Sequence, residues 1–267
     1  MTRAVHSYMK MTVALCLLLF QANERPPFDQ INKTNSEMSL VEISQELLYA
    51  ARTGEPVDTF THILKNIHEK ALEQLQSDEQ KKAFWINIYN AYTQIILRDE
   101  PEQYSNRNRF FRSKQIAIAG HMLSLDDVEH DLLRRSKIKW SLGYLNKPFP
   151  SRFEKRNRVK KLDWRIHFAL NCGAKSCPPI AYYKPEGLGR QLDIATTVYL
   201  RGECNWRPED NIVEVPAIMG WFRRDFGGKD SMRTLLKLME IIPPASKPAI
   251  RFKAYDWELF LQNYKSE

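Results

Sequence analysis

The segment Arg165–Pro179 carries the residue types that most favour chemistry in this chain. It contains an imidazole at His167, thiols at Cys172 and Cys177, and a hydroxyl at Ser176. A thiol becomes a useful nucleophile when a base or a positive environment promotes its thiolate. Because His167 and Arg165 could supply that environment, the segment predicts Cys172 as a nucleophile and His167 as its base.

An alternating pattern predicts how this segment is held. Residues 164–171 alternate between polar and apolar positions, which predicts a strand ending at Cys172 and Gly173. Backbone N–H groups at such a turn could receive developing negative charge. The alternation puts His167 and Cys172 on opposite faces, so their contact requires a bulge, or else His167 meets Cys177 across the loop.

A second candidate group breaks the pattern of a helix predicted from Ser124 onward. Leucine and valine side chains form its apolar face, and Glu129 projects into the middle of that face. At regular helical spacing Asp126, His130 and Arg134 point elsewhere. We expect Glu129 to be a buried carboxylate that orients His167, as in hydrolytic triads. The alternative is a structural ion pair of Glu129 with Arg165 or Arg134.

Buried amides are predicted on a third element. The sequence AFWINIYNAYTQIIL at 83–97 is apolar around most of a helix, and Ser77 with Gln80 predicts its capping box. Asn87, Asn90 and Gln94 fall in one narrow stripe. Amides on such a helix must line a cleft or bind neighbouring backbone, and both alternatives stay open.

The number of cysteines and the spacing of motifs limit which disulfide, metal and cofactor sites are possible. Cys172 and Cys177 could instead form a disulfide that closes the loop, which in an exported protein is as well supported as a free catalytic thiol. His167, Cys172, Cys177 and Cys204 lack metal-ligand spacing, so we expect no metal site. Phosphate-binding and dinucleotide-binding glycine motifs are missing from the sequence, and we expect no cofactor.

Length and composition predict one domain of the α+β class. The chain has 267 residues, of which 43% are hydrophobic and 11% aromatic, enough for a sizeable core. Strands and helices do not alternate regularly, which favours a helix-rich domain with a small, mostly antiparallel sheet over a doubly wound one. We expect a leader or signal peptide at 1–22, a linker at 23–35 and the globular domain at 36–267.

The N-terminus and the charge balance indicate location and partners. A positive start and a short apolar run (TVALCLLLF) are typical of export to the periplasm or cell envelope. The alternative is a buried first helix in a cytoplasmic protein. The net charge of +8 and the basic stretch Lys147–Lys161, read as a loop, favour an anionic surface or polymer as partner. Nothing else in the sequence supports a nucleic-acid partner.

Three segments together resemble a known family. AFWINIYNAYT, LSLDDVEH with LLRR, and RIHFALNCGAKSCPPI are similar to the bacterial branch of the family called domain of unknown function 547, as are WFRRDF and YDW near the end. The resemblance spans about Glu69 to Trp257. It implies no settled activity, and a relation to papain-like or transglutaminase-like folds is analogy alone. The motif positions that it marks on this chain are Asn87, Asn90, Glu129, His130, Arg165, His167, Asn171, Cys172, Ser176 and Cys177.

The sequence therefore supports two alternative functions. The first is a thiol-dependent hydrolase or acyl-transfer enzyme in which Cys172, His167 and Glu129 are catalytic. The second is a non-catalytic binding or scaffold module with a Cys172–Cys177 disulfide. For the enzyme, we expect the substrate-binding residues to be Asn87, Asn90, Arg165, Asn171, Ser176 and Cys177.

Overall fold

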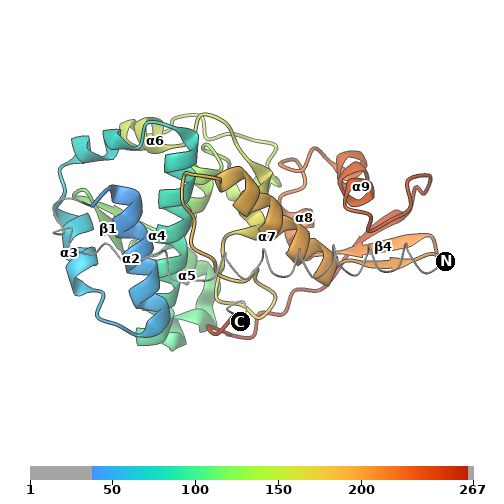
Figure 1. The fold of residues 1–267 in the computed structure, drawn as a ribbon, viewed down its shortest axis with the longest axis horizontal. Helices are drawn as coiled ribbons and strands as arrows, with labels where there is room; N and C mark the ends of the chain where they lie inside the picture. The colour runs from blue at the N-terminus through green and yellow to red at the C-terminus, as the bar shows by residue number, and fades with distance from the viewer. Residues whose placement is uncertain (1–37, 264–267) are drawn as a thin grey trace, which may run out of the picture.

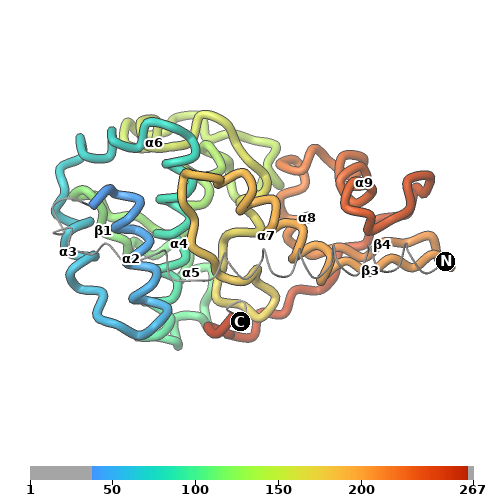
Figure 2. The backbone as a smooth tube through the Cα atoms, viewed as in Figure 1, coloured from blue at the N-terminus to red at the C-terminus, as the bar shows by residue number. Residues whose placement is uncertain are grey.

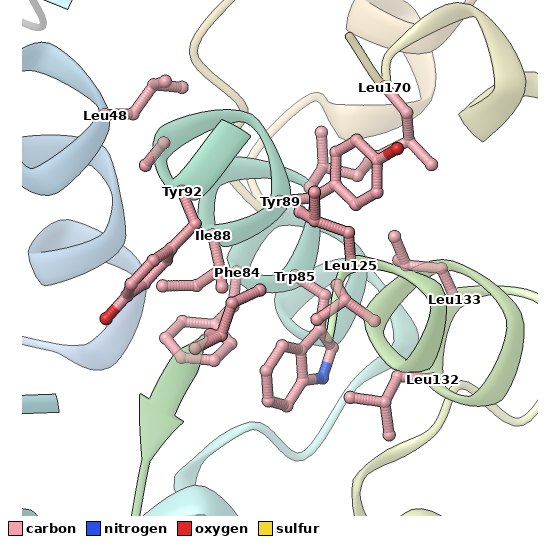
Figure 3. Packing of buried hydrophobic residues seen from close by; sticks show 14 of the residues in the cluster. Leu48, Phe84, Trp85, Ile88, Tyr89, Tyr92, Leu125, Leu132, Leu133 and Leu170 are labelled. Atoms are coloured by element: carbon pink, nitrogen blue, oxygen red, sulfur yellow. The ribbon is translucent and has the colours of Figure 1, made fainter. Parts of the chain in front are cut away.

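Helix α4, Asp78–Asp99, is the central element of a computed structural model that describes residues 38–263. Ser77 and Gln80 form the capping box that starts it, as predicted. Fifteen of its side chains are buried, because α2 (Leu40–Thr53) packs along it and the segment after Ser124 covers another side. Figure 3 shows Phe84, Trp85 and Tyr89 pointing outward from α4 into this shared core.

Shorter elements surround α4. In the N-terminal part they are α3 (Asp58–Asn66), η1 (Glu69–Gln74), η2 (Pro101–Asn106), α5 (Arg107–Arg112), the strands β1 (Ile116–Ile118) and β2 (His121–Leu123), the π-helical segment η3 (Asp127–Leu133), η4 (Lys139–Ser141) and α6 (Arg152–Asn157). The C-terminal part contains η5 (Trp164–Phe168), α7 (Leu188–Glu203), β3 (Asn205–Arg207), β4 (Ile212–Val215), α8 (Ala217–Trp221), α9 (Lys229–Leu238) and β5 (Ala249–Phe252).

The fold is α+β, helix-rich, with two small sheets. Strands β1 and β2 form an antiparallel pair turned by Gly120, whose φ is +74°. In the second sheet the order is β3–β4–β5; β3 pairs antiparallel with β4, whereas β5 pairs parallel with it. The expectation of a small, largely antiparallel sheet system is confirmed, with β5 as the parallel exception.

Two apolar clusters meet near the predicted chemical segment. One surrounds α2 and α4, and the other lies between the second sheet, α7 and α9. Figure 2 shows α2 and α4 in one half of the molecule and α9 and β4 in the other, with α7 between them. Ile166 of η5 belongs to the first cluster and Phe168 to the second. Segment 164–177 therefore lies at the junction of both clusters.

Two predicted elements are wrong. Residues 164–168 form the 3₁₀ turn η5 instead of a strand, because Asp163 caps the N–H of Arg165 and the N–H groups of Ile166 and Ala169 bond three residues back. The stretch Lys147–Lys161 is not all loop: Ser151 and Glu154 form a capping box that starts α6. Its two phenylalanines differ, since Phe153 is buried and Phe149 is 89% exposed.

The expected leader at 1–22 and linker at 23–35 lie outside the described residues. Between residues 38 and 263, none of the helices combines the length and the apolar character that crossing a bilayer requires.

Candidate active site

A cavity of about 700 Å³ brings together the reactive side chains. Its polar lining includes Glu129 and His130 from η3, His167 from η5 and the thiol residue Cys172. Glu129 was predicted from one segment of the sequence, and His167 and Cys172 were predicted from another. The rest of the wall is largely aromatic, with side chains that include Tyr89, Phe111, Trp140, Trp221, Phe222, Tyr255 and Trp257.

The thiol of Cys172 has hydrogen-bond partners that favour its thiolate. The hydroxyl of Tyr255 lies 3.3 Å from its Sγ and 3.1 Å from the Sγ of Cys177. The Cys177 thiol, and secondarily the Tyr255 hydroxyl, lower the pKa of Cys172 to about 7 despite burial. Burial raises the pKa of Cys177, so that thiol stays protonated and acts as a donor.

Cys172 and Cys177 do not form the disulfide that was the alternative prediction. Cys172, Cys177 and Cys204 are free thiols among the described residues. The backbone N–H of Cys172 donates to the Sγ of Cys177 at 2.9 Å, which folds the loop so that both sulfurs approach Tyr255.

Two side chains, an amide and a hydroxyl, hold this loop. Asn171 accepts from the N–H of Gly173 at 2.9 Å and donates to the carbonyl of Pro178 at 2.8 Å. The hydroxyl of Ser176 accepts from the N–H of Asp256 at 2.9 Å, which ties the loop to the segment that carries Tyr255. Asn171 and Ser176 thus act on backbone that positions Cys172.

The carboxyl of Glu129 is held in an unusual environment. Burial raises its pKa to about 7, although Arg134 opposes the shift, and the charge of Cys172 adds to it. The two groups are thus electrostatically coupled, and at neutral pH each is near half-ionised. Groups with such displaced pKa values in one cavity are typical of acid–base sites.

The helix that carries Glu129 is wound more widely than expected. The N–H groups of Arg134 and Ser136 bond to the carbonyls five residues back, at Glu129 and Asp131. Wider winding changes the angle between successive side chains, and π-helical turns are frequent at functional sites. The expectation that Asp126 and His130 point away from Glu129 is therefore wrong, since both line the same cavity.

His167 pairs with Asp225, not with Glu129. Its Nε2 lies 3.0 Å from Oδ2 of Asp225, and Nε of Arg134 donates to the same oxygen at 2.8 Å. All three side chains are fully buried. Burial lowers the pKa of His167 to about 4, so the imidazole is neutral at pH 7. The predicted orienting role of Glu129 is wrong in this respect, because Asp225 occupies that place.

Aromatic stacking fixes the imidazoles. His167 lies flat against Phe222, with ring centroids 3.9 Å apart and an angle of 7° between the planes. Arg134 lies over the same ring and donates from Nη1 to Nδ1 of His130 at 3.0 Å. Because burial also holds the pKa of His130 well below its usual value, the cavity has two neutral imidazoles supported by one Arg134–Asp225 ion pair.

The predicted substrate-binding amides and Arg165 bind other groups. Asn87 exchanges two hydrogen bonds with the backbone of Tyr183, at 2.8 and 3.0 Å. Asn90 donates to the carbonyl of Ala169 and accepts from the N–H of Asn171, at 2.9 and 2.8 Å. Arg165 forms ion pairs with Asp163 and Asp193. Among the described residues that line the cavity, none of these three side chains is included.

The site also contains residues whose roles the sequence did not reveal. Asp225 and Phe222 lie in the WFRRDF motif and Tyr255 in the YDW motif, but neither motif has a reactive pattern that assigns a role. Arg134 belongs to LLRR, and the sequence offered it only as a possible ion-pair partner of Glu129. The signal in the sequence was that these motifs resemble the same family as the chemical segment does.

The comparisons with known proteins agree with the resemblance of the motifs. A search of curated proteins and a search of solved structures gave no match. Residues 72–200, just under half of the chain, match the family described as "Protein of unknown function, DUF547". The matched range carries Glu129, His167 and Cys172, whereas Asp225 and Tyr255 lie beyond it. The chain is therefore similar to the DUF547 family over residues 72–200.

Proposed function

We propose that the chain is a thiol-dependent hydrolase or acyl-transfer enzyme with Cys172 as nucleophile and Glu129 as general acid and base. One observation carries the proposal: a thiol with its pKa lowered to about 7 and a carboxyl with its pKa raised to about 7 line the same cavity. Two such groups can exchange proton roles at neutral pH.

The reaction follows from these two groups. The thiolate of Cys172 attacks the carbonyl carbon of an ester, thioester or amide, and an Sγ–C bond forms. Protonated Glu129 gives its proton to the leaving group as the bond to the carbonyl breaks. The Glu129 carboxylate then takes a proton from water or from another acyl acceptor. The deprotonated acceptor attacks the thioester carbonyl, and the thiolate of Cys172 leaves. The hydroxyl of Tyr255 stabilises the thiolate at the start and end of the cycle.

His167 is assigned a positioning role in this scheme. Its Nε2 is bound to Asp225, and its pKa of about 4 makes it a weak base. Within residues 38–263, the Cys177 thiol and the Tyr255 hydroxyl stabilise the Cys172 thiolate, and no imidazole hydrogen bond to its Sγ is observed. His167 with Phe222 instead forms a rigid, neutral floor beneath the reacting groups.

Iodoacetamide labelling measured at each cysteine as a function of pH tests the nucleophile. We expect Cys172 to label with a midpoint near pH 7, and a Cys177→Ala variant to label about tenfold more slowly at that pH, because the main cause of the lowered pKa is gone. Cys204 is an internal control, since burial raises its pKa to about 12. Equal labelling of Cys172 and Cys204 would contradict the proposal.

Covalent chemistry is tested separately with p-nitrophenyl acetate. The enzyme should show a burst of p-nitrophenol and an acetyl group on the peptide that contains Cys172, and Cys172→Ser should abolish both. Glu129→Gln should keep the acetyl group but slow its hydrolysis. An enzyme that folds, shows a reactive Cys172 and never becomes acylated would overturn the acyl-transfer assignment.

The aromatic wall favours a second candidate, a non-catalytic binding module. Trp221 and Trp257 stack with centroids 5.5 Å apart, and such a surface can bind ligands without reaction. A protein that binds a ligand but shows no acetylation would support this alternative.

A further proposal concerns location. The charged, apolar N-terminus favours export from a bacterial cell, and sequencing the N-terminus of the secreted or periplasmic protein tests it.

A further inference from the structure

Arg107 differs from the other charged residues that line the cavity. Lys139 donates to both carboxylate oxygens of Asp126, at 2.7 and 3.0 Å. Glu129 is near half-protonated at neutral pH. Within residues 38–263, Arg107 forms neither an ion pair nor a side-chain hydrogen bond, although it is half-buried in the cavity wall. The cavity therefore presents one uncompensated cation.

The guanidinium of Arg107 is held by its face. Its central carbon lies 4.9 Å from the ring centroid of Trp257 and 5.9 Å from that of Tyr104. Stacking on aromatic faces orients the plane of an arginine and leaves its N–H edges available. Those edges match the two oxygens of a carboxylate, which arginine binds bidentately.

A continuous aromatic surface leads from Arg107 to the thiol. Trp257 stacks on Trp221 with an angle of 18° between the planes. The ring of Tyr255 lies 4.6 Å from Trp257 and 4.7 Å from Trp221, and its hydroxyl lies 3.3 Å from the Sγ of Cys172. A ligand bound by its anionic end at Arg107 can thus lay a planar or apolar portion along this wall with its other end at Cys172.

We propose that the substrate is an organic carboxylate, bound at Arg107, whose planar or apolar body packs on Trp221 and Trp257. The statement that its other end carries the acyl group rests on the proposed function of Cys172. The carboxylate is a spectator that orients the substrate, so its recognition can be measured without reaction.

Tryptophan fluorescence of the Cys172→Ser variant, titrated with 2-naphthoate, tests the anion site. We expect saturable binding that Arg107→Gln weakens by at least tenfold and that Arg107→Lys weakens less, because lysine keeps the charge but loses the two-pronged geometry. Arg109→Gln is the matched control, since Arg109 is exposed on the same helix α5 and does not line the cavity. It should bind like the parent.

Two further probes set the ligand class. The neutral 2-naphthamide should bind more weakly than 2-naphthoate and show no dependence on Arg107. 2-Naphthyl phosphate should bind no more tightly than 2-naphthoate; tighter binding of the phosphate would overturn the carboxylate assignment. Equal affinity of the parent and Arg107→Gln for 2-naphthoate would overturn the anion site.

The acetylation experiment distinguishes failure of the anion site at Arg107 from failure of the proposed enzyme function of Cys172. If binding of 2-naphthoate depends on Arg107 but Cys172 never becomes acylated, the result would support the anion site and reject the enzyme. Acylation of Cys172 with binding of 2-naphthoate that is indifferent to Arg107 would support the enzyme and reject the anion site.

Discussion

Asp225 accepts a hydrogen bond from Nε2 of His167 at 3.0 Å, across 58 residues of sequence. The same oxygen accepts from Arg134, and the three side chains have no exposed surface. Burial would raise the pKa of Asp225, but the hydrogen bonds from His167 and Arg134 hold it below its ordinary value. The buried ion pair therefore keeps both charges, and the neutral imidazole depends on it for orientation.

Replacing Asp225 by asparagine should be strongly destabilising. The variant keeps the shape of the side chain but leaves the guanidinium of Arg134 buried without a counter-charge, a change that typically costs about 3–5 kcal/mol. Urea unfolding measures it. Asp230→Asn is the control, because Asp230 is exposed and pairs with Arg233 at the surface, where ion pairs contribute little. A loss no greater than that of the control would mean that the network is dispensable.

Gly143 lies against the Asp225 carboxylate of this network. A Cβ atom added there would lie 2.2 Å from Oδ1 of Asp225, and the φ of Gly143 is +88°. Gly143→Ala should therefore displace Asp225 as well as strain the backbone. Gly120→Ala separates the two causes, because Gly120 has a φ of +74° and open space around it.

We expect Gly120→Ala to cost about 1 kcal/mol, from the left-handed backbone alone. Gly143→Ala should cost about 1–3 kcal/mol more, as overpacking in buried sites does. Thermal unfolding of both variants checks the difference. Similar losses at the two positions would show that the loop around Gly143 yields without disturbing Asp225.

Local signals in the sequence predicted several elements correctly. The capping box of Ser77 and Gln80 marks the start of α4, because it depends only on residues three apart. Glu129 was identified because a carboxylate interrupts an apolar face, and burial with a raised pKa is its physical consequence. These features need no knowledge of distant segments.

Features that depend on tertiary contacts were missed. Alternation at 164–171 predicted a strand, but Ile166, His167 and Phe168 are all buried, since apolar clusters cover η5 from two sides. The assumption of regular helical spacing misplaced His130. Asp225 and Tyr255 come from segments that fold back from far along the chain, and no local pattern distinguishes them from ordinary surface residues.

Asn90 offers a test of whether the buried amides hold the fold or contact substrate. It is fully buried, and its side chain joins the carbonyl of Ala169 to the N–H of Asn171, immediately before Cys172. Asn90→Ala leaves both backbone groups unpaired, and each buried unpaired group costs about 1–3 kcal/mol. Urea unfolding should show this loss, and labelling of Cys172 should slow because its loop is displaced. Unchanged stability would favour a role for Asn90 in binding.

Glu129 should make the stability of the protein depend on pH in a defined window. Its pKa is about 7 in the folded protein and near the ordinary 4.5 when unfolded. Between these values the folded state binds more protons, so the free energy of unfolding falls as pH rises from about 4.5 to about 7. His167 acts in the opposite direction, because its pKa of about 4 lies below its ordinary 6.5.

Glu129→Gln isolates the first effect, because His167 is present in both proteins and its contribution cancels in the difference. The variant should gain stability relative to the parent by on the order of 3 kcal/mol between pH 4.5 and 7.5, with little further change above. Chemical unfolding at a series of pH values measures the difference. Glu73→Gln, which removes an exposed carboxylate, is the control for surface charge. A difference that stays flat across the window would mean that Glu129 ionises as it does in water, and the cavity would then lack the acid that the proposed reaction requires.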